Sequence, residues 1–239
     1  MLNSSETTEI HQKLFNFIPN SLLSSQYKIN LSKSLNNSSA YTSSNHHLTN
    51  LLQGHSGCVN TLCWSHKGDF LLSGSDDQNL IIHKYTPGNQ CEKLMTFKTT
   101  HSNNIFDAKF TPGKQDTIVS VAADGRVCIT DDWQNRNFND LNTRTLVASE
   151  TEEAKRLEFI DENVFLVGCY DGKIVQFDLR ESKPIKRISI NLTEQQVGIH
   201  SIAKCPSAPH LLAVAGSDPF VRIYDLRSTR ENTTPTFSW

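Results

Sequence analysis

The sequence predicts an all-β protein made of four copies of one unit. Aspartates recur every 47 residues, and each lies in a short polar turn between two apolar runs: Asp77, Asp124, Asp171 and Asp218. Apolar residues on both sides keep the same period: Leu71, Ile118, Phe165 and Leu212 before the turn, and Leu80, Val127, Ile174 and Val221 after it. A fixed period of this length indicates a repeat architecture, and short apolar runs bounded by turn residues indicate antiparallel strands.

The first repeat begins at residues 51–55. We expect its four strands at residues 59–64, 70–75, 80–85 and 94–98. The segments between them, 67–69, 76–79 and 87–89, contain Gly, Asp, Asn and Pro. These residue types favour turns, so the first repeat reads as a four-stranded antiparallel unit.

Three further repeats follow in the same register. We expect their strands at residues 105–110, 118–122 and 127–131, at 157–159, 164–169 and 174–178, and at 199–203, 211–215 and 221–225. The pairs Asp124-Gly125 and Asp171-Gly172 are strong hairpin signals, because glycine accepts the positive φ of a tight turn. The repeats therefore form one domain over residues 51–230, followed by a tail at 231–239.

Residues 1–50 form a separate segment that is rich in Ser, Asn and Thr. A segment of this composition buries too little apolar surface to offset the entropy cost of ordering, so we expect most of it to be disordered. The alternative is a short helix near its start. Ile10, Leu14 and Phe17 have helical spacing, and Pro19 would end that helix.

The composition excludes several functional classes. A net charge of −2 gives no basic footprint for nucleic acid or an anionic membrane. The N-terminus lacks the basic and apolar regions of a secretory signal, and no apolar run reaches the roughly 18 residues of a membrane span. The six cysteines form no CxxC pair. We therefore expect reduced thiols in an intracellular protein of the cytoplasm or nucleus, not disulfides or a zinc site.

The residues that open, centre and close the units resemble WD40 repeats. Gly54-His55 opens a unit, Ser73-Gly74-Ser75-Asp76-Asp77 lies at its centre, and Phe177-Asp178 or Tyr224-Asp225 closes one. The resemblance implies a β-propeller in which each unit is a four-stranded blade. It also implies structural roles for His55 and His101. Each histidine would lie between blades, in a buried clasp with the turn aspartate and a strand hydroxyl.

This sequence departs from the WD40 pattern in three places. The closing aromatic residue is never Trp. The first unit has His83-Lys84 where an aromatic-Asp pair is expected, and the third unit lacks its opening histidine. The clasp is therefore expected to be incomplete.

Three longer strings resemble a narrower group, the WD-and-tetratricopeptide-repeats proteins and their relatives among the cullin-4-associated factors. These strings lie at residues 52–60, 104–110 and 219–225. Residues 1–50 do not match that group, and no tetratricopeptide pattern follows the repeats. A seven-bladed propeller is implied by the resemblance, so four units make an incomplete ring. We expect a truncated isoform or an incomplete gene product; the alternative is a ring closed by self-association.

No catalytic motif accompanies the repeats. The sequence has no Walker loop, dinucleotide fingerprint, esterase elbow or HExxH helix. The repeated aspartates each occupy the same turn of a different unit, so a propeller would spread them around the ring. We therefore expect a protein that is not an enzyme and has no catalytic residue, cofactor or metal site.

Arg180 and Arg227 are the candidate interaction residues. Each follows an aromatic-Asp-Leu tripeptide, and the first two units lack such an arginine. Arginine suits fork-shaped pairing with carboxylates and carbonyls at an interface. In WD40 proteins that resemble cullin-4-associated factors, an Asp-x-Arg that closes the blade binds the damaged-DNA-binding adaptor of the ligase. The resemblance thus implies an adaptor site at Asp178, Arg180, Asp225 and Arg227; the alternative is two ordinary exposed arginines.

The function implied by the resemblance is that of a substrate receptor in a cullin-4 RING ubiquitin ligase, and hence a role in protein ubiquitination. Its partners would be the adaptor and protein substrates, and substrates would use the opposite rim, near residues 102–104. A helix that carries Ile10 and Leu14 would add a helix-in-groove contact with the adaptor. The alternative function is a chromatin or signalling scaffold that binds peptides or histone-modifying partners without a ligase.

Overall fold

The computed structural model describes residues 51–86, 91–113, 116–134, 142–150, 152–189, 191–192, 195–227 and 237–238. The chain divides into two units, residues 1–49 and 50–239, and all of the described structure belongs to the second. The helix expected around Ile10 and Leu14 lies outside the described residues. In the part of the chain that the structure describes, no helix is long and apolar enough to cross a membrane.

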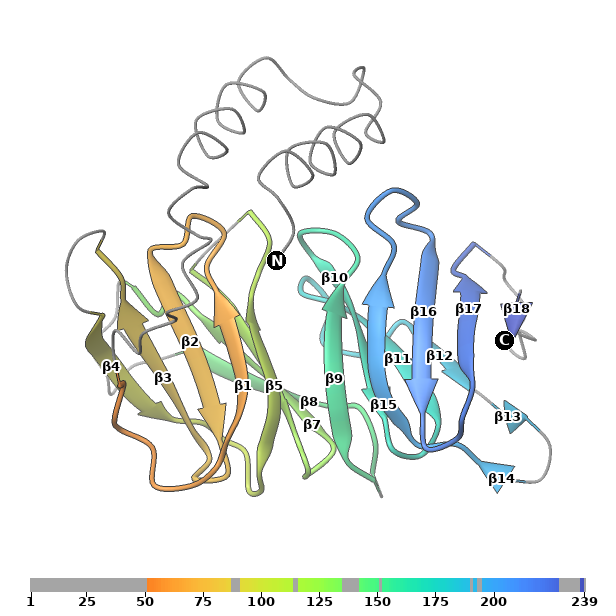
Figure 1. Cartoon of the computed structure of the whole chain (residues 1–239), viewed down its shortest axis with the longest axis horizontal. Coiled ribbons are helices and arrows are strands. Elements are labelled where there is room, and N and C mark those ends of the chain that lie inside the picture. The colour runs from red at the N-terminus through yellow and green to blue at the C-terminus, as the bar shows by residue number, and fades with distance from the viewer. Residues whose placement is uncertain are drawn as a thin grey trace, which may run out of the picture. The chain divides into compact units, whose positions relative to one another are not determined.

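The described fold is all-β, as the sequence predicts, and each repeat forms one four-stranded antiparallel sheet, called a blade from here on (Figure 1). Blades 1 and 2 consist of β1 (Val59–Trp64), β2 (Phe70–Ser75), β3 (Asn79–Lys84) and β4 (Glu92–Lys98), then β5 (Ile105–Phe110), β6 (Ile118–Ala122), β7 (Arg126–Asp131) and β8 (Asn142–Val147). Blades 3 and 4 consist of β9 (Ala154–Phe159), β10 (Val164–Cys169), β11 (Lys173–Asp178) and β12 (Lys186–Ser189), then β15 (Ile199–Lys204), β16 (Leu211–Gly216), β17 (Val221–Asp225) and β18 (Phe237–Ser238). Between them, β13 (Asn191–Leu192) pairs with β14 (Gln195–Gln196) in a short ribbon.

The strands of each blade follow one another in chain order, and the first strand of each blade is innermost. Successive innermost strands contact one another, β1 with β5, β5 with β9 and β9 with β15. This is the arrangement of β-propeller blades in an incomplete ring, as expected from the repeat count.

A β-bulge interrupts each innermost strand just after its start. The register shifts between Val59 and Thr61, between Ile105 and Asp107, and between Ile199 and Ser201, and the same irregularity occurs in blade 3. Each bulge adds one residue that has no partner on the neighbouring strand. These unpaired residues are Asn60, Phe106, Lys155 and His200.

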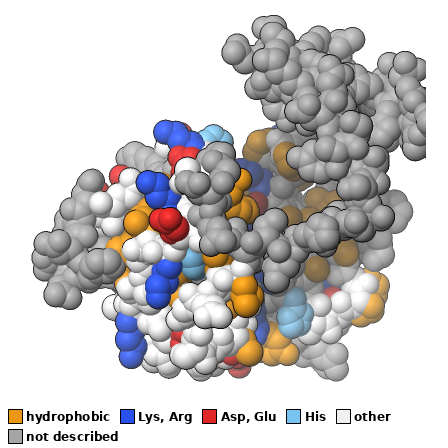
Figure 2. Space-filling model, turned by 60° about the vertical axis from the view of Figure 1, so that its left-hand side comes forward, with side chains coloured by type: hydrophobic (Ala, Val, Ile, Leu, Met, Phe, Trp, Pro, Cys, Tyr) orange, Lys and Arg blue, Asp and Glu red, His pale blue; other side chains and the backbone are white. Residues whose placement is uncertain are grey.

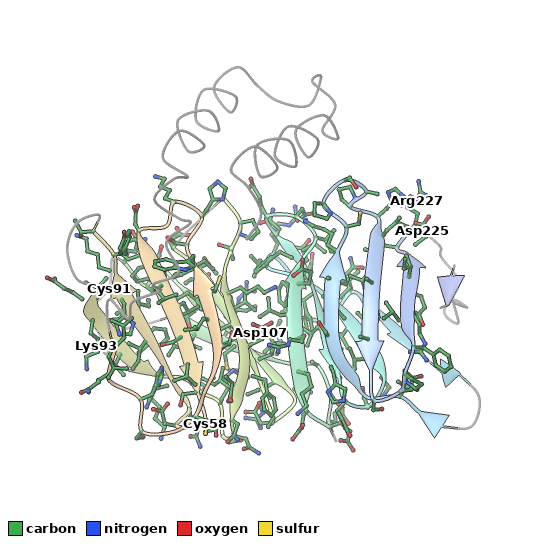
Figure 3. The ribbon with its side chains drawn as sticks, viewed as in Figure 1. Cys58, Cys91, Lys93, Asp107, Asp225 and Arg227 are labelled. Atoms are coloured by element: carbon green, nitrogen blue, oxygen red, sulfur yellow. The ribbon has the colours of Figure 1, made fainter. Side chains whose placement is uncertain are left out.

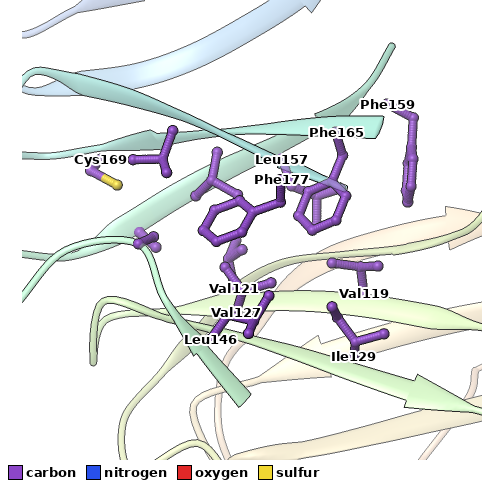
Figure 4. Packing of buried hydrophobic residues seen from close by; sticks show 14 residues of the cluster. Val119, Val121, Val127, Ile129, Leu146, Leu157, Phe159, Phe165, Cys169 and Phe177 are labelled. Atoms are coloured by element: carbon purple, nitrogen blue, oxygen red, sulfur yellow. The ribbon is translucent and has the colours of Figure 1, made fainter. Parts of the chain in front are cut away.

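The hydrophobic core lies between blades instead of inside one blade. Figure 4 shows the joint between blades 2 and 3, where Val119 and Val127 of blade 2 pack with Leu157, Phe165 and Phe177 of blade 3. The two phenylalanine rings are stacked with centroids 5.3 Å apart. Similar clusters join blade 1 to blade 2 and blade 3 to blade 4. Since fully burying one large apolar side chain contributes about 1.5–3 kcal/mol, each blade depends on its neighbours for much of its stability.

A buried carboxylate ties three blades together near their innermost strands. Asp107 of blade 2 accepts a hydrogen bond from Thr61 Oγ1 of blade 1, at 3.0 Å. Its other oxygen accepts one from the backbone N–H of Leu157 in blade 3, at 3.1 Å. Because a buried polar group is costly unless it is paired, these bonds fix the register of one blade against the next.

Candidate functional site

The clasp in blade 1 joins a histidine, a turn aspartate and a strand serine. Nδ1 of His55 lies 3.1 Å from Oδ2 of Asp77, and Nε2 lies 2.9 Å from Oγ of Ser73. The backbone N–H groups of Ser56 and Asn79 also donate to Asp77, both at 2.9 Å. Burial raises the pKa of Asp77, but these hydrogen bonds outweigh it and the pKa is lowered.

Blade 2 repeats this arrangement with a more deeply buried histidine. Nδ1 of His101 lies 3.1 Å from Oδ1 of Asp124, and Nε2 lies 3.0 Å from Oγ of Ser120. Burial lowers the pKa of His101, but the hydrogen bonds to Asp124 and Cys128 outweigh it and raise the pKa to about 9. Burial raises the pKa of Asp124, yet its bond to His101 and the N–H of Ser102 bring that pKa down to about 2. The pair is therefore ionised at neutral pH.

Blade 3 has a serine where the first two blades have histidine. Ser149 Oγ donates to Asp171 at 3.1 Å, and Lys173 Nζ approaches the same carboxylate at 2.7 Å. In blade 4, Arg222 pairs with Asp218. Like Lys173 in blade 3, Arg222 lies on the third strand of its blade. The four aspartates thus lie in the turns of four different blades and are not gathered in one cleft. Among the described residues, no group of three His, Cys, Asp or Glu could hold a metal ion.

Sequence reasoning missed Arg222. Its side chain is only 1% exposed, and its guanidinium donates to both oxygens of Asp218. The signal was present in the sequence, since the same position of the repeat holds Ile81, Cys128 and Val175 in the other blades. A charged residue at an apolar position of the repeat indicates a buried ion pair.

His83 occupies the position where the repeat normally ends in an aromatic residue. It is buried, and neither ring nitrogen has a hydrogen-bond partner among the described residues. Burial, together with the nearby charges of His55 and Lys93, lowers its pKa. The neutral form of the imidazole is therefore favoured.

Arg180 and Asp178 form a two-pronged ion pair, called a fork from here on, at the end of β11. Nε and Nη2 of Arg180 donate to the two oxygens of Asp178, at 2.8 and 2.5 Å, and the backbone N–H of Arg180 donates to Oδ1 at 2.9 Å. The carboxylate is buried, whereas the arginine side chain is 69% exposed. Hydrogen bonding to Arg180 lowers the pKa of Asp178 to about 2.

Arg227 repeats this geometry one blade further on. Nε and Nη2 of Arg227 donate to Asp225 at 2.9 and 2.5 Å, and the backbone N–H donates at 3.0 Å. Figure 3 shows the two side chains together at the end of β17, at the opposite edge of the molecule from Cys58, which precedes β1. The arginine side chain is again 69% exposed. We call the edge that carries Arg180 and Arg227 the arginine rim.

A residue of the neighbouring blade supports the fork in blade 3. Arg144 of β8 donates from Nη2 to the carbonyl of Leu179, and from Nη1 to the carbonyl of Glu181 at 3.3 Å. These carbonyls flank Arg180, so Arg144 fixes the turn that presents it. Sequence reasoning missed Arg144, because nothing in its own strand marks a contact with the next blade.

The opposite rim holds the starts of the innermost strands, where the bulge residues meet. Asn60, Phe106, Lys155, Arg156 and His200 line a concavity of about 310 Å³ there. The ammonium of Lys155 lies 3.8 Å from the centre of the Phe106 ring and also pairs with Glu153. Arg156 is exposed and donates to the carbonyl of Phe106 at 3.4 Å. The concavity therefore combines an aromatic face with cationic and hydrogen-bonding groups.

Comparison with known proteins agrees with the repeat geometry. Residues 46–84 match the family model described as WD domain, G-beta repeat. The chain therefore contains a WD40 repeat. The resemblance predicted from its sequence strings is thereby confirmed.

This WD40 chain is similar to longer proteins. It is 40% identical over 182 residues to WD and tetratricopeptide repeats protein 1 of Homo sapiens. The matched region covers 74% of this chain and 26% of that protein. It is 37% identical over 183 residues to DDB1- and CUL4-associated factor 6 of Homo sapiens, covering 74% of this chain and 20% of that protein. The chain is 33% identical to WD repeat protein iqw1 of Schizosaccharomyces pombe, and the matched region covers 76% of this chain and 24% of that protein. The chain spans about a quarter or less of the length of these curated relatives.

Proposed function

We propose that this WD40 chain is a non-enzymatic scaffold that serves as a substrate receptor of a cullin-4 RING ubiquitin ligase, in the cytoplasm or nucleus. The observation that carries the proposal is the pair of equivalent Asp–Arg forks on the arginine rim, at Arg180 and Arg227. The name of one relative, DDB1- and CUL4-associated factor 6, describes that protein as associated with DDB1 and CUL4.

The forks are suited to recognition because the arginines are exposed and already oriented. Two contacts to Asp178, and the backbone bond to the same carboxylate, hold the Arg180 side chain in one geometry. Binding a partner then costs less side-chain entropy than it would for a free arginine. A planar guanidinium with unused N–H groups suits carbonyl and carboxylate acceptors on the adaptor.

We assign a different kind of partner to each rim. The adaptor would lie on the arginine rim, and protein substrates would lie on the opposite rim, where residues 102–104 precede β5 and the 310 Å³ concavity lies. A helix-in-groove contact from the segment around Ile10 and Leu14 remains part of the proposal.

The test is a binding titration of the purified adaptor against the chain and its variants. We expect Arg180→Ala or Arg227→Ala to weaken binding about 10-fold each, the scale of an interface hot spot, and the double variant to abolish it. Arg126→Ala is the matched control, because Arg126 is exposed at the start of β7, at the end of its blade away from the arginine rim. Wild-type affinity in the double variant would refute the site.

A peptide-binding scaffold without a ligase is the second candidate. The concavity around Phe106, Lys155 and Arg156 favours it, since an aromatic face next to cations suits a peptide that carries acidic groups. The same titration separates the candidates. If the wild-type chain does not bind the adaptor, the ligase role fails and the scaffold role is preferred.

A further inference from the structure

The concavity of about 310 Å³ opposite the arginine rim is called the bulge concavity from here on. Most of its lining comes from blades 2 and 3, because Phe106 belongs to the first of these blades and Lys155 and Arg156 belong to the second. Asn60 of blade 1 and His200 of blade 4 complete the lining. The residues from blades 2 and 3 therefore lie on blades that have a described neighbour on both sides.

Arg156 differs from the residues at the same position of the earlier innermost strands. Strand register aligns it with Thr61 and Asp107, which are 7% and 5% exposed and bond to each other between blades 1 and 2. Arg156 is exposed, and among the described residues its one hydrogen bond is the long one to the carbonyl of Phe106, at 3.4 Å. Most of the guanidinium N–H donors are therefore open to a ligand.

The carboxylates beside the bulge concavity are already paired within the fold. Glu153 pairs with Lys155, and Asp76 accepts a hydrogen bond from Asn60 at 2.7 Å. Asp107 is buried and bonds to the blades on either side of it. The arginine is therefore the charged lining residue that has no counter-ion in the described part of the chain, and the ligand group that suits it is an anion.

The side chains around the arginine are held in place by aromatic contacts. The Lys155 ammonium lies 3.8 Å from the centre of the Phe106 ring and 5.6 Å from the centre of the Tyr170 ring. The Tyr170 ring meets the His200 ring edge-on, with centroids 5.7 Å apart. A Cβ on Gly198 would lie 2.7 Å from the tyrosine ring, so glycine lets this ring lie close to the backbone. The wall of the concavity is thus formed before a ligand binds, which lowers the entropy cost of binding.

The surface of blade 1 provides a contrast in charge. Figure 2 turns blade 1 forward and shows Lys and Arg side chains interspersed with acidic and hydrophobic ones. A surface of mixed sign gives little preference for an anion. The bulge concavity differs from it, because Lys155 and Arg156 are cationic and none of the lining residues is acidic.

We propose that the bulge concavity binds an acidic side chain of a substrate protein, a carboxylate or a phosphoryl group, and that Arg156 pairs with this anion. A planar guanidinium suits both groups, because it donates two parallel hydrogen bonds to neighbouring oxygens. A volume of about 310 Å³ is at the small end of ligand sites, so the concavity has room for a side chain and its neighbours in an exposed peptide segment. The proposal rests on the proposed function in one respect, that protein substrates bind this rim, and it does not depend on the adaptor contact.

The test is the binding of fluorescent peptide pools to the full 239-residue chain. The pools share degenerate flanking positions and differ at one central residue, which is Glu, Gln, phosphoserine or Ser. We expect an anionic centre to bind about fivefold more tightly than its neutral match, the scale of an exposed ion pair. Comparing the Glu–Gln difference with the phosphoserine–Ser difference identifies which source of the anion is preferred.

Variants of the arginine test its role directly. Arg156→Gln should remove the preference for an anion, and Arg156→Glu should reverse it in favour of a pool with a central Lys. Arg126→Gln is the matched control and should keep the preference, because Arg126 is exposed on the same rim, at the start of β7, but does not line the concavity. Circular dichroism checks that each variant still folds.

Each contrary result has a distinct meaning. A wild-type chain with no preference for either anion would refute the inference, and so would a preference that survives in folded Arg156→Gln. An equal loss in Arg126→Gln would show that net charge, and not this concavity, drives the binding. The adaptor titration is a separate readout. If the adaptor fails to bind while the peptide preference depends on Arg156, the ligase role is wrong and the anion site stands.

Discussion

The guanidinium of Arg222 is buried against the carboxylate of Asp218 inside blade 4. Nη1 of Arg222 donates to Oδ1 at 2.9 Å, and the arginine pKa is raised chiefly by this bond. In blades 1 and 2 a histidine that precedes the first strand of the blade is the partner of the equivalent aspartate. The turn carboxylate is therefore paired by side chains from different parts of the blade.

This pair predicts an asymmetric response to mutation. Asp218→Ala leaves a buried guanidinium unpaired, so we expect a loss of about 3–5 kcal/mol of unfolding free energy. The double variant Asp218→Ala/Arg222→Met removes both charges and should recover most of that loss. Urea unfolding of the three chains measures it. A double variant that is no more stable than the single one would contradict the prediction.

The pair of His101 and Asp124 predicts a pH window of maximum stability. The pKa of His101 rises from 6.5 to about 9 on folding, so its contribution is fully present below pH 6.5 and is lost as the pH rises through 9. The pKa of Asp124 falls from 3.8 to about 2, so its contribution is present above pH 3.8 and is lost as the pH falls through 2. The stability difference between wild type and His101→Gln should therefore be largest between pH 3.8 and 6.5.

Thermal unfolding of the two chains across that range provides the measurement. His55→Gln serves as a comparison, because the same contacts are made in blade 1 by a less deeply buried histidine. A difference between wild type and His101→Gln that did not change with pH would show that the ion pair contributes nothing on folding.

His83 predicts a stabilising substitution. Its buried ring nitrogens have no partner among the described residues, so His83→Phe should raise the unfolding free energy by about 1–2 kcal/mol. Because the folded pKa lies below the usual 6.5, the wild type also loses stability as the pH falls below 6.5, and the variant should not. His101→Phe is the matched control and should destabilise, since His101 is fully paired. Denaturant unfolding at two pH values tests both statements.

Two glycines with the same backbone geometry predict different costs. Gly125 and Gly68 have φ of 70° and 75°, which non-glycine residues rarely adopt. A Cβ on Gly125 would lie 2.3 Å from the carbonyl oxygen of Ser149, whereas a Cβ on Gly68 would meet nothing within 4 Å. Gly68→Ala should thus cost only the roughly 1–2 kcal/mol of left-handed strain, and Gly125→Ala clearly more. Equal losses in thermal unfolding would contradict this.

The repeat lattice could be predicted because it depends on local patterns. Turn aspartates and flanking apolar residues recur at a fixed distance, and the strands around them form where expected. The outer strands β8, β12 and β18 were not predicted, because their sequences lack a regular apolar alternation. β9 begins at Ala154, three residues before the predicted start. The prediction started too late because the charged residues Lys155 and Arg156 interrupt the apolar pattern. In the structure, Lys155 contacts the Phe106 ring of the neighbouring blade, and no local pattern reports this contact.

The arginine forks could also be predicted from the sequence, because Asp178 and Arg180 are only two residues apart. The contacts between blades could not be predicted from the sequence. Arg144 reaches carbonyls 35 and 37 residues later in the chain, and Thr61 bonds to an aspartate 46 residues away. Such pairs depend on how blades pack, which no local pattern reports.

At the start of each innermost strand, the β-bulge places one side chain at the surface concavity while the preceding residue keeps its place in the strand pairing. At each bulge one residue leaves the pairing, and its neighbours Ile105, Ala154 and Ile199 remain in the core. The four bulge residues are an amide, a phenyl ring, an ammonium and an imidazole, and together they line one concavity. Asn60 also donates to Asp76 and to the carbonyl of Ile105 in the next blade, so it contributes to the fold. Phe106, Lys155 and His200 lie outside the hydrophobic clusters, so substitutions there can change the chemistry of that surface and create new specificities on the same scaffold.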